Sequence, residues 1–464
     1  MAHRIEKDAL GELAVPHDAY HGVQTERAVQ NFPISGMRLP GALNVALVQI
    51  KLAAARVNQS LGALDGKLAS AIVQACEEVL AGKLGEPFVV DAFQAGAGTS
   101  QHINVNEVLA NRANELLGGK RGEYRPVHPN DHVNLGQSTN DVVPTAVRLA
   151  ALAEAGPLDS ALGALVVALR ARAKDFDGIV KSGRTHLADA APIRFGQEIG
   201  AWASALAGHR TRLARACEGL TALGIGGSAV GTGLNCPPGY RVGMAKELST
   251  ITGFKLRGAD DYFEAMQSAA PIVELSSVLR GLALELIRIC NDVRLLASGP
   301  LTGLGELLLP AVQPGSSIMP GKVNPVMAEM LTMVCFDVVG RDTTVALAAQ
   351  AGQLELNVMM PVIAHALLPA ERHLATAINA FTERCIHGLE ADIERCTHYA
   401  QQSPQLVTAL APRLGYARAA ELAKQAVAQH KTVNELAVSQ GLITAQEADR
   451  LLDPRPLTEP EVRE

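Results

Sequence analysis

The chain has 464 residues, enough for two or three domains, and its formal net charge is −6. This charge argues against a nucleic-acid-binding protein. The charged N-terminal sequence and the lack of an apolar run of ~18 residues argue against a secreted protein and against a membrane span. Seven cysteines without a CxxC pair are typical of free thiols, so we expect a cytoplasmic protein. Aromatic residues are only 3% of the chain, so small aliphatic residues must build the core, and Ala and Leu among them favour helices.

Residues 1 to about 40 are rich in turn-forming residues and are predicted to form an irregular arm. Helical periodicity dominates after them. Its clearest stretch is 262–300, with a kink expected at Pro271 and an end at Gly299. No strand pattern of comparable length occurs, so the sequence predicts a mainly α fold with a long helix bundle. Further helices are expected over 42–84 with interruptions, 104–117, 144–155, 197–220, 326–351, 354–383, 416–429 and 444–452.

Four segments dense in glycine and small polar residues interrupt this pattern. They are QAGAGTSQHINVNE (94–107), GQSTND (136–141), SGRTHLADAAP (182–192) and GSSIMPGKVNP (315–325). Each precedes a helical pattern, and a helix N-terminus favours anions because its N–H groups lack partners. Asn324 is expected to be the N-cap of the last of these helices. For any one segment a well-capped helix is the simpler interpretation, but the four together predict a site for a small dicarboxylate.

Other chemistries fit the sequence less well. The segment GSSIMPGK misses the GxxxxGK[ST] phosphate loop, and the glycine-rich LGIGGSAVGTGLN (223–235) follows no convincing strand, which argues against dinucleotide binding. Pro129 interrupts a helix that would present both His128 and His132, so we expect these histidines either to cap backbone groups or to be satisfied surface histidines, and expect no metal site. Trp202 is expected in the core.

The segment GSSIMPGKVNP closely resembles the signature loop of the aspartase/fumarase superfamily. The resemblance extends along nearly the whole chain, because further motifs of that superfamily occur in its order. They are VPHDAYHGVQTERAVQNFPISG (15–36), AGAGTS and NVNEVLAN (within 95–111), HPNDHVN (128–134), QSTND (137–141), SGRTHL (182–187) and GTGLN (231–235). The joint pattern is highly specific, and on it the chain is identified as a member of this superfamily.

The resemblance implies three mostly helical domains, which we place at 1–137, 138–390 (the central long-helix bundle) and 391–464. It also implies a homotetramer with a twenty-helix core, in which each active site takes segments from three subunits. The implied activity is that of a lyase that releases fumarate from a substituted succinate by anti elimination, without a cofactor or a metal ion. The expected partners are a small dicarboxylate and other copies of the chain, and neither a nucleic acid nor a membrane.

The same resemblance assigns roles to residues of the four segments. Ser316 is the base that removes the proton, on a loop that closes over the substrate. Because a serine hydroxyl is a poor base, N–H groups of the loop and nearby cations must stabilise its alkoxide. His186 and Glu329 are the other catalytic residues, and Glu329 orients His186. The substrate-binding residues are Thr99, Ser138, Thr139, Asn140, Thr185, Lys322 and Asn324, of which the last two bind a carboxylate.

Two activities of the superfamily remain open, the release of ammonia from L-aspartate and the release of water from L-malate. The segments QSTND and DAYHGVQT and the region 334–363 resemble aspartases, whereas GRTH is common in fumarases. We expect an aspartate ammonia-lyase, with fumarate hydratase as the alternative. A structural tetramer without turnover is a third interpretation, but the joint presence of Ser316, Lys322 and His186 argues against it.

Three positions depart from the superfamily pattern. His102 stands where asparagine is usual, and Ala411 replaces an asparagine often found before the following proline. Leu301 and Thr302 stand where an arginine is frequent. Because His102 is close to Thr99 in the sequence, it could alter the pocket and favour a related amine or an N-substituted aspartate as substrate.

Overall fold

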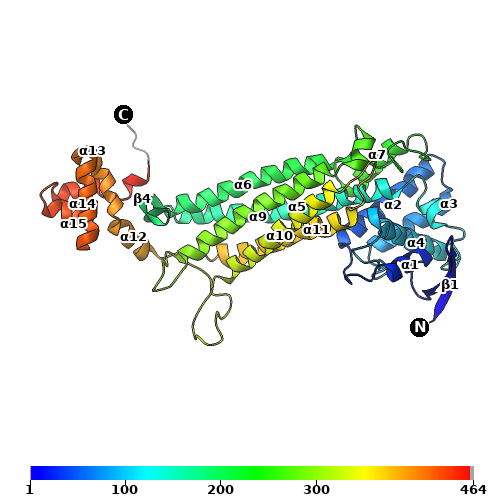
Figure 1. Cartoon of the computed structure of the whole chain (residues 1–464), viewed down its shortest axis with the longest axis horizontal. Helices are drawn as coiled ribbons and strands as arrows, with labels where there is room; N and C mark the ends of the chain where they lie inside the picture. The colour runs from blue at the N-terminus through cyan, green and yellow to red at the C-terminus, as the bar shows by residue number, and fades with distance from the viewer. Residues whose placement is uncertain (1, 460–464) are drawn as a thin grey trace. The chain divides into compact units, whose positions relative to one another are not determined.

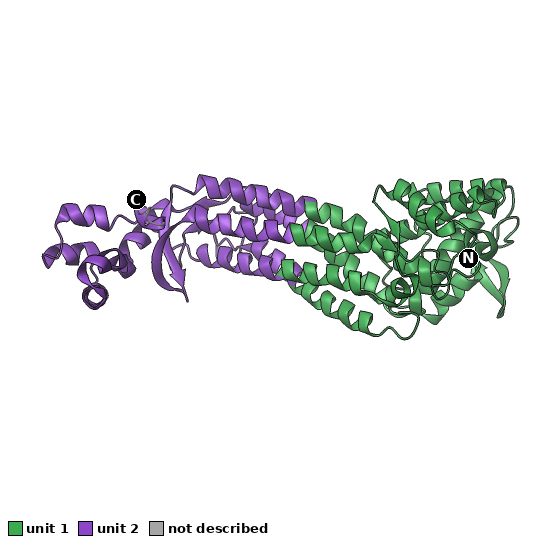
Figure 2. Cartoon of the chain, turned by 90° about the horizontal axis from the view of Figure 1, so that it is seen from above, with its two compact units in different colours: residues 1–159, 211–283, 336–375 green, residues 160–210, 284–335, 376–464 purple. Residues whose placement is uncertain are grey.

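The computed structural model describes residues 2–459, which form two compact units, shown in different colours in Figure 2. Each unit combines three stretches of the chain. Unit 1 comprises residues up to 159, 211–283 and 336–375, and unit 2 comprises residues 160–210, 284–335 and those from 376 onward. The predicted division into three domains has a different basis and stays a prediction.

Unit 1 consists mostly of helices. Helices α2, α3 and α4 contact one another, and α7 contacts α2. Their buried faces include alanines such as Ala53, Ala69 and Ala75, all 0% exposed, and such small side chains let helices approach closely. The elements are β1 (His3–Asp8), β2 (Gly11–Pro16), α1 (Val23–Asn31), α2 (Gly41–Ser60), α3 (Gly66–Leu80), η1 (Gly96–Gly98), α4 (Thr99–Leu116), η2 (Pro129–Val133), β5 (Ala222–Leu223), α7 (Tyr240–Thr252), β6 (Arg257–Gly258) and α8 (Tyr262–Gln267).

Five long helices, labelled in Figure 1, have residues in both units. Their bounds agree within a few residues with most of the predicted long helices, and the break between α8 and α9 confirms the kink expected near Pro271. The first of them differs, because α5 begins before residue 144 and continues through Pro144 and Pro157. The five are α5 (Thr139–Asp175), α6 (Phe195–Leu220), α9 (Ala270–Leu296), α10 (Val326–Gln350) and α11 (Met360–Phe381).

Helix α5 is, within residues 2–459, the one helix that is long and apolar enough to cross a membrane. Half of its most apolar window is buried inside the chain, and it carries the buried charged residues Asp141 and Arg148. Arg148 donates hydrogen bonds to the carbonyl oxygens of Gly219 and Ala222 (3.2 and 2.9 Å). These features are typical of a core helix.

Unit 2 contains two short two-stranded sheets and the C-terminal helices. Strand β3 pairs antiparallel with β4, and β7 pairs antiparallel with β8. The elements are β3 (Val180–Thr185), β4 (Ala188–Arg194), β7 (Leu307–Leu308), η3 (Thr382–Ile386), β8 (Glu390–Ala391), α12 (Ile393–Gln402), η4 (Pro404–Leu410), α13 (Ala411–Leu414), α14 (Tyr416–Gln429), α15 (Val433–Ser439), α16 (Ala445–Leu451) and η5 (Pro456–Thr458).

The C-terminal helices of unit 2 have a core of their own. Buried apolar residues from 406 to 452 form one cluster that includes Leu410, Leu422 and Leu436. Helices α15 and α16 each begin with a capping box, in which a threonine and the glutamate three residues later exchange hydrogen bonds with each other's backbone N–H. This local chemistry explains why the short helices α15 and α16 form here, and the helices expected over 416–429 and 444–452 are confirmed as α14 and α16.

The prediction of an irregular arm before residue 40 is wrong. Residues 3–16 form an antiparallel hairpin of β1 and β2, and α1 follows it. Arg4 fixes the turn after the hairpin, because its guanidinium donates hydrogen bonds to the carbonyl oxygens of Pro16 and Ala19 (2.9 and 2.8 Å). One side chain thus orders a segment whose local composition indicates only turns.

The segment 182–192 also differs from its prediction. It was expected to lie directly before a helix, but it forms most of the β3–β4 hairpin, and α6 begins only at Phe195. The pairing shifts register between Ser182 and Arg184. A Cβ on the intervening Gly183 would lie 2.5 Å from the carbonyl oxygen of Ala191, so the hairpin requires glycine there.

Candidate active site

The candidate residues fall into two groups, one in each unit. Most lie at the start of a helix or in the segment before it, and all are half-buried or exposed. Thr99, Ser138, Thr139 and Asn140 belong to unit 1, and Thr185, His186, Ser316, Lys322, Asn324 and Glu329 belong to unit 2.

In unit 1, Thr99 is the first residue of α4. The preceding Ala97 and Gly98 both have left-handed backbone conformations, with φ of 62° and 90°. A Cβ on Gly98 would also lie 3.0 Å from the Val143 side chain of α5. Glycine therefore lets the start of α4 lie close to α5, which carries the next candidate residues.

Thr139 and Asn140 are the first residues of α5 and Ser138 directly precedes them, and the Asp141 carboxylate joins this segment to another part of unit 1. One Asp141 carboxylate oxygen accepts a hydrogen bond from the Ser138 N–H (2.9 Å), and the other accepts from the N–H groups of Gly226 and Ser228 (2.9 and 3.0 Å). Burial raises the pKa of Asp141 to about 6, although these hydrogen bonds oppose the shift. Asp141 thus joins the segment GQSTND to the glycine-rich segment 223–235, a structural role for those glycines.

Behind Thr139 lies a buried polar chain that the sequence analysis did not identify as a unit. The Nδ1 atom of His102 lies 2.8 Å from the Oγ1 atom of Thr139, and its Nε2 atom lies 2.6 Å from the Nζ atom of Lys51. Lys51, on α2, also donates hydrogen bonds to Asn134 Oδ1 (2.9 Å) and Gln137 Oε1 (2.8 Å). Lys51 is 0% and His102 2% exposed. The departure at His102, noted in the sequence, therefore lies directly against a candidate substrate-binding hydroxyl.

Charges and burial set the protonation of this chain. Burial lowers the pKa of Lys51 to about 7, while the Asp141 carboxylate opposes this shift. Burial and the charge of Lys51 hold the pKa of His102 well below its ordinary value. His102 is therefore neutral at physiological pH.

In unit 2, Ser316 lies in the long loop between α9 and α10, visible in Figure 1. Its Oγ atom accepts hydrogen bonds from the N–H groups of Ile318 (3.2 Å) and Met319 (3.0 Å). Backbone N–H groups that donate to an oxygen stabilise a negative charge on it. Within the described residues, this is the arrangement that the expected alkoxide of Ser316 requires.

The ends of this loop are held together at Gly315. Its N–H donates to the carbonyl oxygen of Lys322 (2.8 Å), and its own carbonyl accepts from the side-chain amide of Asn324 (2.6 Å). A Cβ on Gly315 would lie 2.5 Å from the Lys322 carbonyl oxygen. The Asn324 side chain closes the loop instead of capping α10, which begins at Val326, so the prediction of an Asn324 N-cap is wrong.

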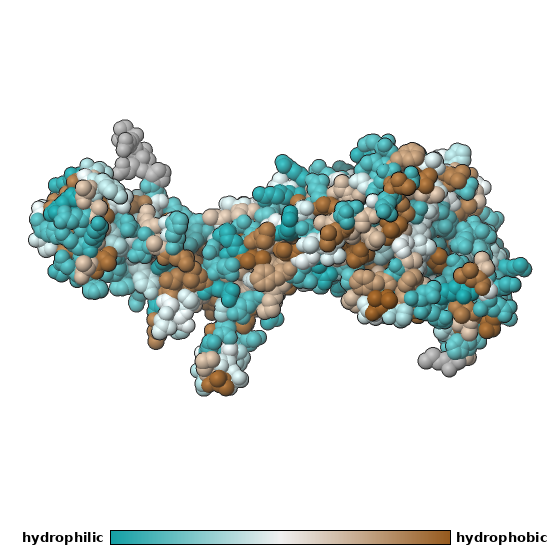
Figure 3. Space-filling model, viewed as in Figure 1, coloured by the Kyte–Doolittle hydropathy of each residue, from teal (hydrophilic) through white to brown (hydrophobic). Residues whose placement is uncertain are grey.

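The loop has exposed apolar side chains and lines a pocket in which two polar side chains lie among mostly apolar neighbours. Figure 3 shows hydrophobic surface at the end of the protruding loop, and Ile318 of this loop is 84% exposed. Lys322 and Asn324 line a pocket of about 260 Å³ together with Pro300 and Leu308. The two expected carboxylate-binding residues therefore line one cavity. Ser316, nearer the N-terminal end of the loop, is not among the residues that line it.

Thr185 and His186 lie at the two-residue turn of the β3–β4 hairpin. Thr185 pairs with Ala188, and the central residues His186 and Leu187 both have positive φ, 56° and 59°. These are the signs of a type I′ turn, which glycine or asparagine normally forms. Here His186 and Leu187 take the places of glycine or asparagine, so the backbone of the turn is strained. Such strain is concentrated at functional sites.

Below this turn, a buried ion-pair network supports the hairpin. Glu306, 0% exposed, accepts from both Arg184 (2.9 and 3.0 Å) and Lys181 (3.3 Å). Lys181 is itself buried and also pairs with Glu198 (3.0 Å). Since Glu306 lies directly before β7, the network joins the hairpin that carries His186 to the segment that leads into the Ser316 loop.

The pairing predicted between Glu329 and His186 is absent among the contacts of residues 2–459 within one chain. His186 is exposed and Glu329 is half-buried on α10. Their pairing stays a prediction that involves other copies of the chain.

Two further sequence predictions can be compared with the structure. His128 caps η2, because its Nδ1 accepts from the N–H groups of Asn130 and Asp131, which confirms the capping interpretation. Trp202 is 2% exposed, so its place in the core is confirmed. Within the described part of the chain, no group of three His, Cys, Asp or Glu side chains is placed to hold a metal ion.

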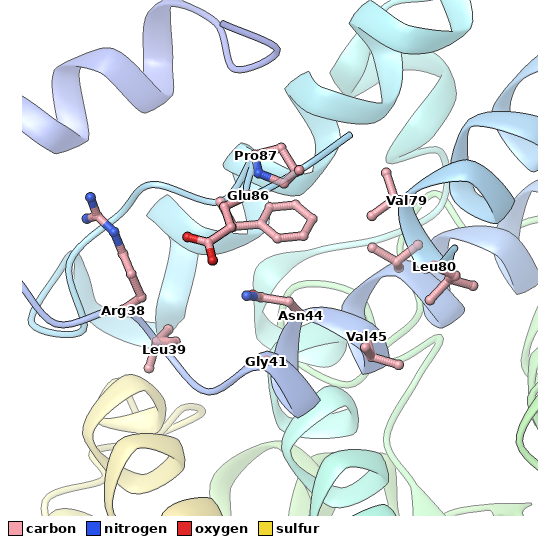
Figure 4. A pocket seen from close by; sticks show the side chains of 12 residues that line it. Arg38, Leu39, Gly41, Asn44, Val45, Val79, Leu80, Glu86 and Pro87 are labelled. Atoms are coloured by element: carbon pink, nitrogen blue, oxygen red, sulfur yellow. The ribbon is translucent and has the colours of Figure 1, made fainter. Parts of the chain in front are cut away.

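Unit 1 also contains a separate pocket of about 330 Å³ (Figure 4). It is lined by Arg38, Asn44 and Glu86 among mostly apolar neighbours. None of the candidate residues lines it, so the pocket does not contribute to the candidate site.

Comparison with known proteins decides the family. A family model described as Lyase matches residues 11–340, and one described as Fumarase C C-terminus matches residues 406–459. The chain belongs to the aspartase/fumarase superfamily. The resemblance found in the sequence is thereby confirmed, and the chain is a lyase.

Members of the superfamily that are similar to this chain have different names. Fumarate hydratase class II 2 of Bradyrhizobium diazoefficiens is 47% identical over 460 residues, which cover 99% of this chain and 97% of that protein. Aspartate ammonia-lyase of Bacillus subtilis is 43% identical over 458 residues, which cover 99% and 96%. Further similar proteins are named class II fumarate hydratases more often than aspartate ammonia-lyases, so the expected preference for aspartate is not favoured.

Solved structures of the superfamily have the same fold. The fumarate lyase:delta crystallin of Brucella melitensis, bound to cobalt, has a TM-score of 0.96 and 48% identity over 99% of this chain and all of that one (100%). The class II fumarase of Schistosoma mansoni has a TM-score of 0.95 and 37% identity, over 98% and 99%. The predicted mainly α, aspartase/fumarase-like fold is therefore confirmed.

Proposed function

We propose that the protein is a fumarate hydratase, which interconverts L-malate with fumarate and water. The observation that carries the elimination chemistry is the placement of Ser316 Oγ on two backbone N–H groups. The names of the most similar relatives support water as the leaving group. This choice replaces the aspartate preference expected from the sequence.

In the proposed mechanism, the Ser316 alkoxide removes a proton from the carbon next to one carboxylate. The electron pair moves into that carboxylate, which then carries two negative charges. The pair then returns to form the C=C bond of fumarate as the hydroxyl leaves the neighbouring carbon and takes a proton to become water, and Ser316 afterwards releases the proton that it removed. Preorganised donors must stabilise this charge. We assign that role to Lys322 and Asn324, which share a pocket, and to the hydroxyl and amide groups of Thr99, Ser138, Thr139, Asn140 and Thr185.

His186 and Glu329 complete the proposed catalytic set. His186 has the strained backbone of a functional turn, and the Glu306 network holds that turn from below. Glu329 lies in the first turn of α10, directly after the Ser316 loop. We propose that Glu329 orients His186 in the assembled enzyme.

We further propose that the enzyme is a homotetramer whose active sites combine segments from three subunits. Exposed residues of α10 support the association of several copies of the chain. Met333, Phe336 and Leu347 are 64%, 61% and 62% exposed in the single chain. Large apolar side chains on one helix at such exposure mark an interface. The three domains at 1–137, 138–390 and 391–464 belong to this proposal, as does a cytoplasmic location, which suits seven free cysteines.

A second candidate is aspartate ammonia-lyase. It is supported by the relative from Bacillus subtilis, which is similar to the chain along nearly its whole length. Ammonia would then take the place of water, with the same proton removal by Ser316.

The proposal is tested by following fumarate in the ultraviolet after the purified protein is mixed with L-malate or with L-aspartate. We expect fumarate from L-malate, with a rate from L-aspartate at least about 100-fold lower at equal concentration, since a site built for one leaving group rejects another by such factors. Fumarate from L-aspartate alone would instead establish the second candidate. That result, or a protein that forms fumarate from neither compound, would overturn the proposed function.

A further inference from the structure

The most unusual polar group outside the assigned residues is the ammonium of Lys51. It is completely buried on α2, yet its three N–H groups meet three acceptors, Asn134 Oδ1, Gln137 Oε1 and His102 Nε2, at 2.9, 2.8 and 2.6 Å. A lysine ammonium has three donors and no acceptor. Every proton of the charged Lys51 is therefore used.

The orientation of the two amides is fixed independently of Lys51. The side-chain N–H₂ of Asn134 donates to the carbonyl oxygen of Gln137 (3.3 Å), and that of Gln137 donates to the carbonyl oxygens of Val133 and Leu135 (3.1 and 3.3 Å). Each amide must therefore direct its oxygen at Lys51. The cage around Lys51 is a set of acceptors, and His102 has to be the third of them.

This requirement determines the tautomer of His102. Its Nε2 atom must carry the lone pair that accepts from Lys51, so the single proton of the neutral ring is on Nδ1. The Nδ1–H then donates to Thr139 Oγ1 at 2.8 Å. Because the Thr139 oxygen accepts from His102, its own proton is directed elsewhere.

We propose that Lys51 and His102 are positioning residues that hold the Thr139 hydroxyl as a hydrogen-bond donor to the bound dicarboxylate. The inference rests on the proposed function, in which Thr139 contacts the substrate. With its proton free, the hydroxyl of Thr139 can donate to a carboxylate or hydroxyl oxygen of the ligand, which accepts, whereas an ammonium group has no lone pair to accept it.

The same chain predicts a dependence on pH. The titratable groups that face Lys51 are Asp141 of α5, Cys76 of α3 and His102 of α4. When Lys51 loses one proton to solvent, its two remaining N–H groups donate to the amide oxygens and its lone pair faces His102. His102 then carries its proton on Nε2, and its Nδ1 accepts a hydrogen bond from the hydroxyl of Thr139. The hydroxyl no longer donates to the ligand above the pKa of Lys51, which is about 7.

Binding of succinate, a dicarboxylate with no leaving group, tests the inference by calorimetry. Thr139→Val and Lys51→Met are each expected to weaken succinate binding at pH 6 roughly tenfold to a hundredfold, the range for a hydrogen bond to a charged group. In Lys51→Met, the Nε2–H of His102 donates to the amide oxygens, and its Nδ1 accepts a hydrogen bond from the Thr139 hydroxyl, which then no longer donates to the ligand. The double variant is therefore expected to bind no more weakly than the weaker single variant. The exposed Lys67→Met is the matched control, with unchanged affinity.

His102→Asn keeps the inference testable should Lys51→Met fail to fold, because the shorter asparagine cannot reach Lys51. Wild-type affinity for succinate is expected to fall roughly tenfold between pH 6 and pH 8, and this fall is expected to disappear in His102→Asn, while His186 is unchanged in both. Additive effects of Lys51→Met and Thr139→Val, or an unchanged pH profile in His102→Asn, would overturn the inference. Neither outcome would affect the proposed turnover of malate by the wild-type protein. Failure of the proposed function would appear separately, as a wild-type protein that forms no fumarate.

Discussion

Ser316→Ala is expected to lower kcat for fumarate formation from L-malate by roughly 10³-fold, the typical contribution of a positioned general base. The substitution removes only the oxygen that accepts from the N–H groups of Ile318 and Met319. The contacts that close the loop run through Gly315 and do not involve the Ser316 hydroxyl. The oligomer, the helical circular dichroism and the melting temperature should therefore be unchanged.

Ser317→Ala provides the matched control. Ser317 is the exposed neighbour of Ser316 in the same loop, and its loss should change kcat by less than about threefold if the N–H pair at Ser316 is what creates the base. Steady-state rates of the two variants, measured at saturating malate, decide between them. A Ser316→Ala enzyme with near wild-type kcat would show that another group removes the proton.

Glu306→Ala should destabilise the folded protein by about 3–5 kcal/mol, the usual effect of removing one partner of a buried ion pair. The substitution leaves the charge of Lys181, 2% exposed, with Glu198 alone, and it leaves the half-buried Arg184 without its carboxylate. The loss comes from stranded buried charge. Glu306→Gln, which keeps the shape and one acceptor, should cost less.

Urea unfolding, followed by circular dichroism, gives the free-energy changes. Glu390→Ala, in the exposed part of strand β8, is the control and should stay within about 0.5 kcal/mol of wild type. The network supports the turn that carries His186. The fraction of the Glu306→Ala protein that stays folded should therefore also have a lower kcat. A Glu306→Ala protein as stable as the control would show that the network contributes little to the fold.

Some residues of the candidate site could be predicted because their motifs are contiguous in the sequence. Ser316, Lys322 and Asn324 lie within eleven residues, GSSIMPGKVNP, whose glycine and proline content already indicates a loop. The structure adds what the letters do not contain, namely that Asn324 closes the loop at Gly315 instead of capping α10. A side-chain amide can do either, and only the backbone path decides.

Other residues could not be predicted because their partners are remote in the sequence. Lys51 and Thr139 are joined through His102, and Arg184 meets Glu306 across more than a hundred residues. No local pattern indicates such a pair, and a lysine in an apolar helix is usually a solvated one. The one available signal was that Lys51 falls on the apolar face of α2, which indicates a buried position. Its charge, however, would have argued against burial.

The helices were predictable for the opposite reason, since periodicity and caps are local. The long helices and α16 were expected from apolar spacing, whereas α15 was not expected, although a Thr–Glu pair three residues apart caps both α15 and α16. The N-terminal hairpin and the turn after it were missed because their contacts are not local: β1 pairs with β2, and Arg4 donates to backbone carbonyls up to seventeen residues away. Composition indicates a turn there, but it does not indicate what fixes the turn.

The most direct test of the account is the product that the enzyme makes from fumarate in D₂O that contains ammonium, followed by proton NMR. The account predicts L-malate with one deuterium on the carbon that does not carry the hydroxyl, as a single diastereomer from anti addition, and formation of this product roughly 10³-fold more slowly with Ser316→Ala. Deuterated aspartate as the main product, or deuterated malate formed equally well without Ser316, would contradict it.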